Sequence, residues 1–323
     1  MRRELLPSWR PGATRDAVLG FLDSSGSVPV EQRVACFDND GTLWCERPTY
    51  VQLDFFLDAL ESALRADPGL ARKPEFAALR SGDQTAIGEI GLERIAFALT
   101  GLFEGWSPEE FTAQVREFMT RADHATLGRP LRTVTYQPML ELLAELRQRD
   151  FTVCVVSGGG TEFVRAIGGD LYGVPPQNVV GSLIAYDFVP TDDHGAGPFL
   201  RRTSVLAGGA NEGATKVSNI QAQLGRRPIL AAGNSGGDRE MLEWVAAGDG
   251  PTLTLLVDHD DADREFAYVS AAATLAETEP ITDVAARLRW TVVSIRRDWE
   301  DVFAPTPAGT GGGQARVKPD IDS

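Results

Sequence analysis

Two aspartates separated by one residue, Asp38 and Asp40, come directly after a short apolar run in the segment FDNDGTLW. Neighbouring carboxylates repel each other, so they need a cation or a shared proton. Magnesium prefers hard oxygen ligands and is often held by one or two carboxylates together with a substrate phosphate. Gly41 would allow a tight turn, and Thr42 could donate a hydroxyl hydrogen bond. A solvated turn at a strand end is the simpler interpretation, and the aspartate pair alone favours it.

Three further polar segments could take part in the same chemistry. In VVSGGGTEF, Ser157 and Gly158 end an apolar run where a helical pattern begins, which is typical of an anion cradle or of an ordinary glycine-rich turn. In GNSGGD, Asn234 and Asp238 follow another apolar run, where a helix N-cap is the alternative. Lys216 precedes a helical pattern and, taken alone, would be a surface residue.

The elements that must position these segments are short apolar runs with helical patterns between several of them, such as the one over 138–149. The runs are RVACFD before Asn39, FTVCVV at 151–156, PILAA at 228–232, TLTLLV at 252–257 and TVVSI at 291–295. Buried strands alternating with helices predict a parallel sheet that is covered on both faces. Because the carboxyl ends of parallel strands meet at one crevice, the four polar segments should converge there. Together they would supply what phosphoryl transfer requires: a nucleophile, an acid–base group, metal ligands and anion-binding donors.

The stretch 47–130 differs, because it holds helix-like segments and no convincing strand. It predicts an all-helical cap inserted after the first core strand, over the carboxyl end of the sheet. Residues 181–206 predict a hairpin around the polar turn TDDHGAG. We therefore expect a discontinuous α/β core of residues 1–46 and 131–304, a helical cap of 47–130, and a disordered tail of 305–323.

Composition narrows the classes of protein. A chain of 323 residues with 43% hydrophobic residues can bury a core and a smaller second domain. The net charge of −15 repels nucleic acids and anionic lipids, so we expect neither as a partner. Three cysteines match no zinc pattern and favour a reducing compartment. No signal peptide or membrane-length apolar run is evident, so the expected location is cytoplasmic. The oligomeric state stays open.

Taken together, the four segments resemble the haloacid dehalogenase superfamily, and its phosphoserine-phosphatase-like branch in particular. The family's hydrophobic-DxDGT motif corresponds to FDNDGTLW, its serine motif to VVSGGG, its lysine to Lys216 and its GDxxxD motif to GNSGGD, in the family's order across 34–243. The resemblance implies a Rossmann-like, doubly wound core. It also implies a magnesium-dependent phosphatase that hydrolyses a small phosphorylated metabolite through a phosphoaspartate intermediate.

The resemblance also implies a role for each matching residue. Asp38 would be the nucleophile, and Asp40 the general acid and base. The groups expected to bind the phosphoryl oxygens are Thr42, Ser157, Gly158 and Lys216. The residues expected to hold Mg²⁺ are Asp38, Asp40, Asn234 and Asp238.

Two departures from the family pattern stand out. Asn234 takes the place of an aspartate and brings no negative charge. Glu46 falls one position before the glutamate that phosphoserine phosphatases place after their first motif, so phosphoserine is not predicted. Asp40 argues against dehalogenation, because dehalogenases of this family lack the acid–base aspartate and need no metal.

Two alternatives to hydrolysis stay open. A phosphotransferase or phosphomutase would use the same residues with another acceptor. A non-catalytic phosphometabolite-binding protein is favoured by Asn234 but opposed by the intact Asp38.

Other side chains have simpler explanations. His259, among several acids, could serve a second metal or substrate site, but we favour a buried hydrogen-bonding histidine. Phe103, Trp106 and Phe118 fall at helix-like spacings that favour the core of the cap over a substrate cage.

Overall fold

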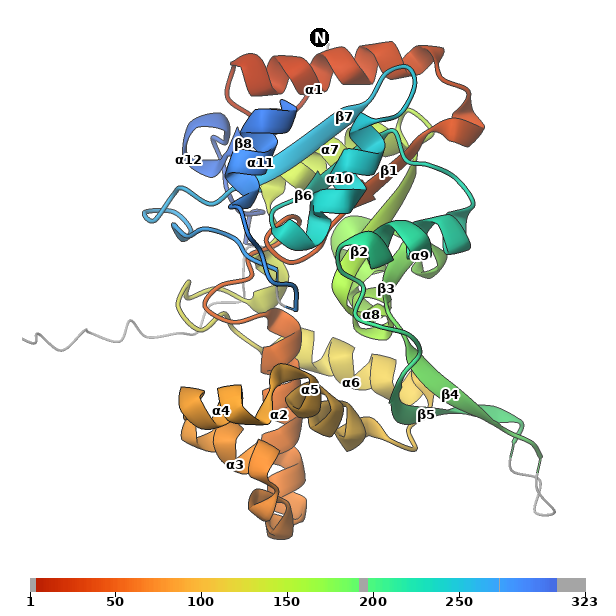
Figure 1. Ribbon diagram of the computed structural model, residues 1–323, viewed down its shortest axis with the longest axis vertical. Coiled ribbons are helices and arrows are strands. Elements are labelled where there is room, and N and C mark those ends of the chain that lie inside the picture. The colour runs from red at the N-terminus through yellow and green to blue at the C-terminus, as the bar shows by residue number, and fades with distance from the viewer. Residues whose placement is uncertain (1–3, 192–196, 273, 307–323) are drawn as a thin grey trace, which may run out of the picture.

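A six-stranded parallel sheet forms the centre of the computed structural model, with strand order β3-β2-β1-β6-β7-β8 (Figure 1). The strands are β1 Val34–Phe37, β2 Thr152–Gly160, β3 Val179–Ser182, β6 Leu230–Gly233, β7 Leu253–Asp258 and β8 Thr291–Ser294. The structure describes residues 4–191, 197–272 and 274–306. The centre of the predicted polar turn and the predicted tail from 307 onward lie outside these described residues.

Both faces of the sheet are covered by helices, as the sequence predicts. In β1, Ala35 and Phe37 join the core on one face, whereas Val34 and Cys36 join the core on the other. The helices on the first face are α1 Ala13–Ser24, α7 Gln137–Arg147 and α8 Thr161–Tyr172, and those on the second are α9 Ala214–Leu224, α10 Arg239–Ala246 and α11 Ile281–Leu288. The short helix α12, Ile295–Asp298, follows β8. None of the described helices is long and apolar enough to cross a bilayer.

The order of the strands creates a switch point beside β1. From β1 the chain runs outward to β2 and β3, and it then returns to place β6 on the other side of β1. Ligands of open α/β sheets bind in the crevice at such a point. The five predicted core strands are confirmed, but β3 was missed. It has only four residues, and its end overlaps the start of the predicted hairpin.

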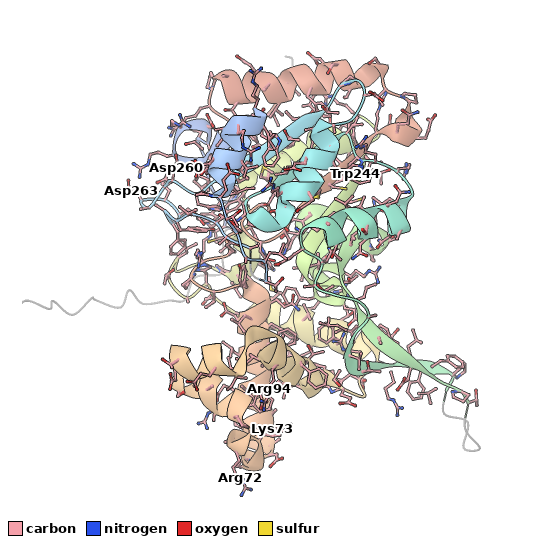
Figure 2. The ribbon with its side chains drawn as sticks, in the orientation of Figure 1. Arg72, Lys73, Arg94, Trp244, Asp260 and Asp263 are labelled. Atoms are coloured by element: carbon pink, nitrogen blue, oxygen red, sulfur yellow. The ribbon has the colours of Figure 1, made fainter. Side chains whose placement is uncertain are left out.

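A helical insertion lies between β1 and β2. Its helices are α2 Val51–Ala66, α3 Pro74–Ser81, α4 Gln84–Ile90, α5 Leu92–Thr100 and α6 Pro108–Arg121. The helices around α3 share a small core of their own, which includes Leu60, Phe76 and Leu99. Figure 2 shows Arg72, Lys73 and Arg94 on this part, away from the sheet. The predicted domain boundaries at 47 and 130 stay a prediction.

The aromatic side chains of the insertion pack together beside α8, as expected. Phe55 stacks on Phe103 at 5.3 Å between ring centroids and meets Phe118 edge-on at 5.6 Å. The Trp106 ring meets Phe103 edge-on, with 5.2 Å between the ring centroids. Phe163 of α8 adjoins Phe55 at 5.6 Å, so this cluster joins the insertion to the core.

The predicted hairpin is confirmed as β4 Ile184–Val189 paired with β5 Phe199–Leu206. It projects from the body of the molecule beside the insertion (Figure 1). Arg202 of β5 donates its N–H to the Trp106 carbonyl (2.8 Å), and the Gly105 N–H donates to the Arg202 carbonyl (2.9 Å). The Arg202 guanidinium lies 3.9 Å over the Phe111 ring. The hairpin and the helical insertion are therefore joined through both backbone and side chains.

Candidate active site

A buried lysine joins two of the predicted aspartates. Asp38 directly follows β1, and its N–H extends the ladder by donating to the Ala232 carbonyl of β6 at 2.9 Å. Lys216 Nζ lies 2.6 Å from Asp38 Oδ1 and 2.6 Å from Asp238 Oδ1. All three residues are buried. We call Asp38, Lys216 and Asp238 the lysine cluster.

The start of α9 places this lysine. Gly213, just before the helix, has φ +58° and ψ −133°, a conformation that only glycine adopts readily. Its N–H donates to the Gly237 carbonyl at 2.8 Å, which ties the start of α9 to the loop after β6. Lys216 lies in the first turn of α9 and therefore faces that loop. The simpler interpretation of Lys216 as a surface residue is wrong.

The lysine cluster carries an excess of negative charge, because two carboxylates share one ammonium group. Burial and the neighbouring Asp238 raise the pKa of Asp38 well above its ordinary value, against the opposing effect of Lys216. Burial alone would lower the pKa of Lys216, but the two aspartates outweigh it and raise that pKa. A second cation beside Asp38 would offset this excess.

Asp40 lies in the tight turn after Asp38. Gly41 makes the turn possible with φ +72°, and its N–H donates to the Trp44 carbonyl at 2.9 Å. The Trp44 indole donates from Nε1 to Asp40 Oδ1 at 2.9 Å and so fixes the carboxylate. Burial raises the pKa of Asp40, although the Trp44 hydrogen bond opposes the shift. A carboxyl group with a raised pKa is suited to proton transfer near neutral pH.

Both oxygens of Asp238 are already engaged. Oδ1 accepts from Lys216, and Oδ2 accepts the N–H groups of Asn234 (3.0 Å) and Ser235 (3.1 Å). The loop closes so tightly that a Cβ on Gly233 would lie 2.4 Å from the Asp238 side chain. Asp238 therefore organises the turn as the third residue of a capping box whose N-cap is Ser235, and it also pairs with the lysine.

The Asn234 amide lies between the lysine cluster and a second polar group. The Thr42 hydroxyl lies 3.4 Å from Asn234 Oδ1 and 3.4 Å from Asp38 Oδ2. On its other side, Asn234 Nδ2 donates to Glu46 Oε1 and to Ser270 Oγ, both at 3.1 Å. Tyr268 donates its hydroxyl to the same Glu46 oxygen at 2.8 Å. We call Glu46, Asn234, Tyr268 and Ser270 the amide network.

Ser157 and Gly158 lie on β2, next to β1, where the strand bulges after Val156. The Ser157 hydroxyl accepts the Gly159 N–H at 3.0 Å, and the Gly160 N–H donates to Gln52 Oε1 of α2 at 2.8 Å. Within the described part of the chain, no hydrogen bond joins Ser157 or Gly158 to Asp38. The structure therefore joins six of the predicted residues, Asp38, Asp40 through the turn, Thr42, Lys216, Asn234 and Asp238, and leaves these two beside them.

Sequence reasoning missed several residues around the site. The roles of Tyr268, Ser270 and Gln52 were not foreseen, and Glu46 was noted only for its spacing. The acid-rich segment LLVDHDDADREFAY held the signal, since His259 Nε2 donates to the Gly41 carbonyl at 2.9 Å and Nδ1 lies 3.1 Å from Glu265 Oε2. The favoured interpretation of His259 as a buried hydrogen-bonding residue is confirmed.

Comparison with known proteins identifies the family. A model described as haloacid dehalogenase-like hydrolase matches residues 35–243, which is more than half of the chain. No curated protein matches the sequence.

Three solved structures are similar to this chain at low identity. One is a protein of unknown function from Bordetella pertussis Tohama I, with 21% identity over 81% of this chain and 98% of that chain and a TM-score of 0.48. Another is a phosphoserine phosphohydrolase-like protein from Francisella tularensis subsp. tularensis SCHU S4, with 17% identity, coverages of 79% and 99% and a TM-score of 0.38. A third is cytosolic 5′-nucleotidase IIIB bound to cytidine, with 14% identity, coverages of 87% and 92% and a TM-score of 0.42.

The matched segment begins in β1, ends in α10 and contains every predicted site residue. The parallel sheet with helices on both faces, which the resemblance implied, is the fold observed. The predicted enzyme class, a hydrolase, is thereby confirmed, and the chain belongs to the family of haloacid dehalogenase-like hydrolases.

Proposed function

We propose that this hydrolase is a magnesium-dependent phosphatase that acts on a small phosphorylated metabolite through a phosphoaspartate on Asp38. The observation that carries the proposal is the placement of Lys216 Nζ, 2.6 Å from Asp38 and 2.6 Å from Asp238, at the switch point of the sheet. A carboxylate nucleophile beside a fixed ammonium group, with a second carboxyl two residues away, matches the needs of phosphoryl transfer.

In the first step, an Asp38 oxygen attacks phosphorus while the bond from phosphorus to the alcohol oxygen breaks. Asp40 gives its proton to that leaving oxygen, so the products are an alcohol and an aspartyl phosphate. The raised pKa of Asp40 supports this role, because the group must be protonated when the step begins. Trp44 holds the Asp40 carboxyl in a fixed orientation during the transfer.

In the second step, Asp40 accepts a proton from water while that water attacks the phosphoryl group. The bond between phosphorus and Asp38 breaks, inorganic phosphate leaves, and Asp38 returns as a carboxylate with Asp40 protonated again. The Lys216 ammonium, the Thr42 and Ser157 hydroxyls and the Gly158 N–H would bind the phosphoryl oxygens in both steps.

The side chains present fit Mg²⁺. Hard oxygen donors are available from the Asp38 carboxylate, the Asp40 main-chain carbonyl and the Asn234 amide, beside a cluster with excess negative charge. When bound, Mg²⁺ supplies charge neutralisation at the phosphoryl oxygens. Because both Asp238 oxygens are engaged, we expect Asn234 to be the direct ligand and Asp238 to orient Lys216 and the loop.

The helical insertion supports a small substrate. Gln52 of α2 reaches the Gly160 N–H at 2.8 Å, beside the predicted anion cradle. A Cβ on Gly159 would lie 2.6 Å from Gln52 Oε1, so the insertion directly contacts the carboxyl end of β2. Helices this close to the site would exclude bulky partners and bulk water.

The test is hydrolysis of a generic aryl phosphate, and then of a phosphometabolite panel, with Mg²⁺ and with a chelator. Wild type should release phosphate only with the metal, and Asp38→Asn should be inactive. If wild type is as inert as Asp38→Asn with every metal and substrate, the proposal is wrong. In isotopically labelled water, hydrolysis puts the label into inorganic phosphate, whereas phosphoryl transfer to an added alcohol would identify a phosphotransferase.

A further inference from the structure

We infer that Glu46 is a positioning residue that orients the Asn234 amide oxygen toward Asp38. Through its hydrogen bond with Asn234, Glu46 also supplies the negative charge that an aspartate at position 234 would have carried. The inference deepens the proposed function and rests on it. It concerns the amide network, whose acceptor Glu46 lies 188 residues from Asn234 in the sequence.

The orientation of the Asn234 amide follows from its partners. Both Nδ2 hydrogens have acceptors, Glu46 Oε1 and Ser270 Oγ, each at 3.1 Å. A rotated amide would place its carbonyl oxygen against the Glu46 carboxylate, where two acceptors repel and no hydrogen bond forms. The oxygen must therefore face Thr42, 3.4 Å from its hydroxyl and on the side of Asp38.

Close packing holds this arrangement in place. A Cβ on Gly41 would lie 2.0 Å from Asn234 Nδ2 and 2.9 Å from Glu46 Cδ. The amide and the carboxylate are thus pressed against the turn that also carries Asp40. Because Gly41 has φ +72°, glycine meets both the conformational and the spatial demand.

The charge of Glu46 has no direct counter-ion. Its side chain is only 7% exposed, and within the described residues no lysine or arginine forms an ion pair with it. Its two donors, Tyr268 and Asn234, are neutral, and the Arg47 guanidinium instead lies 4.3 Å over the Tyr268 ring. A buried carboxylate without a cation is costly, and burial accordingly raises the pKa of Glu46. A metal ion held by Asn234 would compensate that charge through the amide.

The first test measures Mg²⁺ binding by isothermal titration calorimetry. Glu46→Leu frees the amide to rotate and should weaken Mg²⁺ binding about 10- to 100-fold, as the loss of an outer partner does at other metal sites. Glu46→Gln keeps an acceptor oxygen but removes the charge, so it should weaken binding less, by about threefold to tenfold. Partial rescue by glutamine separates the charge from the hydrogen bond.

The sharper test exchanges the charge. Asn234→Asp puts a carboxylate beside Glu46, and the two like charges should leave Mg²⁺ binding no tighter than in wild type. In the Glu46→Gln background the same change restores a single carboxylate, at the position of the ligand itself. The double variant should therefore bind Mg²⁺ at least about tenfold more tightly than Glu46→Gln alone, a coupling that independent sites would not show.

Glu141→Gln is the matched control, because Glu141 accepts two hydrogen bonds from Ser8 and takes no part in the site. It should leave Mg²⁺ binding unchanged, and thermal unfolding of each variant checks that the fold is intact. If wild type binds Mg²⁺ but the Glu46 variants bind equally well, or the effects of Asn234→Asp and Glu46→Gln simply add, the inference is overturned. If wild type neither binds Mg²⁺ nor hydrolyses phosphate esters, the proposed function itself fails.

Discussion

The lysine cluster and the amide network are both buried and polar, and the Thr42 hydroxyl lies between them, yet they are built differently. In the lysine cluster two carboxylates share one ammonium group at 2.6 Å each, so the contacts are short and charged. In the amide network a single carboxylate, Glu46, accepts from neutral donors. Removing Lys216 leaves two buried carboxylates without a cation, whereas removing Glu46 leaves the Asn234 amide free to rotate. The first should therefore govern stability and the second metal binding.

The largest effect is expected from Lys216→Met. It leaves Asp38 and Asp238 buried without their cation, so the free energy of unfolding should fall by about 3–5 kcal/mol. Hydrolysis should slow by at least about 100- to 1,000-fold, because a fixed donor to the phosphoryl oxygens is lost. Chemical denaturation and phosphate release measure the two effects.

Lys73→Met on the exposed surface of the insertion is the control, and its stability should stay within about 0.5 kcal/mol of wild type (Figure 2). Glu46→Gln should cost less than about 1 kcal/mol, because the acceptor oxygen remains. Equal losses for Lys216→Met and Glu46→Gln would remove the distinction between the two clusters.

Gly41→Ala should have an intermediate effect on the free energy of unfolding, because it alters the turn between the lysine cluster and the amide network. The added methyl meets Asn234 Nδ2 at 2.0 Å, and alanine disfavours φ +72°. We expect a loss of about 2–4 kcal/mol in the free energy of unfolding, from the backbone cost and overpacking together. Urea denaturation measures it.

Gly82→Ala isolates the backbone part of that loss. Gly82 has φ +66°, and nothing lies within 4 Å of an added Cβ. The free energy of unfolding of Gly82→Ala should fall by only about 1–2 kcal/mol. If both alanine variants lose the same free energy, the contact between Gly41 and Asn234 is not tight, and the packing argument for the amide network fails.

Asp261 offers a reference for the lysine cluster, because here one carboxylate lies beside two cations, Arg264 and, at 3.8 Å, Arg296. Its Oδ2 accepts from Arg264 Nε at 2.6 Å, and its Oδ1 accepts the N–H groups of Asp263 and Arg264. Burial would raise the pKa of Asp261, but Arg264 outweighs it and lowers that pKa. The pKa of a carboxylate beside two cations thus shifts in the opposite direction to that of Asp38, which shares one cation with Asp238.

A smaller effect than that of Gly41→Ala is expected from Asp261→Asn, about 1–2 kcal/mol of unfolding free energy at pH 7. Because the pKa of Asp261 is lowered in the folded chain, its contribution is full above the unfolded value of about 3.9 and disappears as the pH falls through the folded value. Urea denaturation at pH 7 and at progressively lower pH measures this difference. Asp263→Asn, whose side chain is 81% exposed on the loop after β7, should change little (Figure 2). A difference that grows with acid would contradict the assignment.

Much of the sheet and of the lysine cluster could be predicted from the sequence. β1 is a continuous apolar run and β7 is mostly apolar, because both faces of these strands are buried. Asp38 follows such a run directly and Asp238 lies in the loop after β6, so the sheet topology brings both to the carboxyl ends of neighbouring strands. Only the lysine needed the family resemblance, since nothing in the residues around Lys216 shows that it is buried.

The amide network could not be predicted in the same way. Glu46 and Tyr268 lie outside the strand ends, and their contact spans 222 residues. It depends on the turn at Gly41 and on the path of the loop after β7, neither of which follows from periodicity. The short strand β3 escaped for a related reason, because four residues carry too little pattern to separate them from the hairpin that follows.

The backbone pairing of Arg202 with Gly105 and Trp106 bears on how the molecule could be rebuilt. Besides its contacts with α8 and β2, the insertion is also attached to β5, which lies much later in the chain and whose buried Arg202 lies over the Phe111 ring of α6. Moving the helical insertion alone into another protein would leave the hairpin without its backbone partners Gly105 and Trp106. The helical insertion and the hairpin would therefore have to be exchanged together, although they are far apart in the chain.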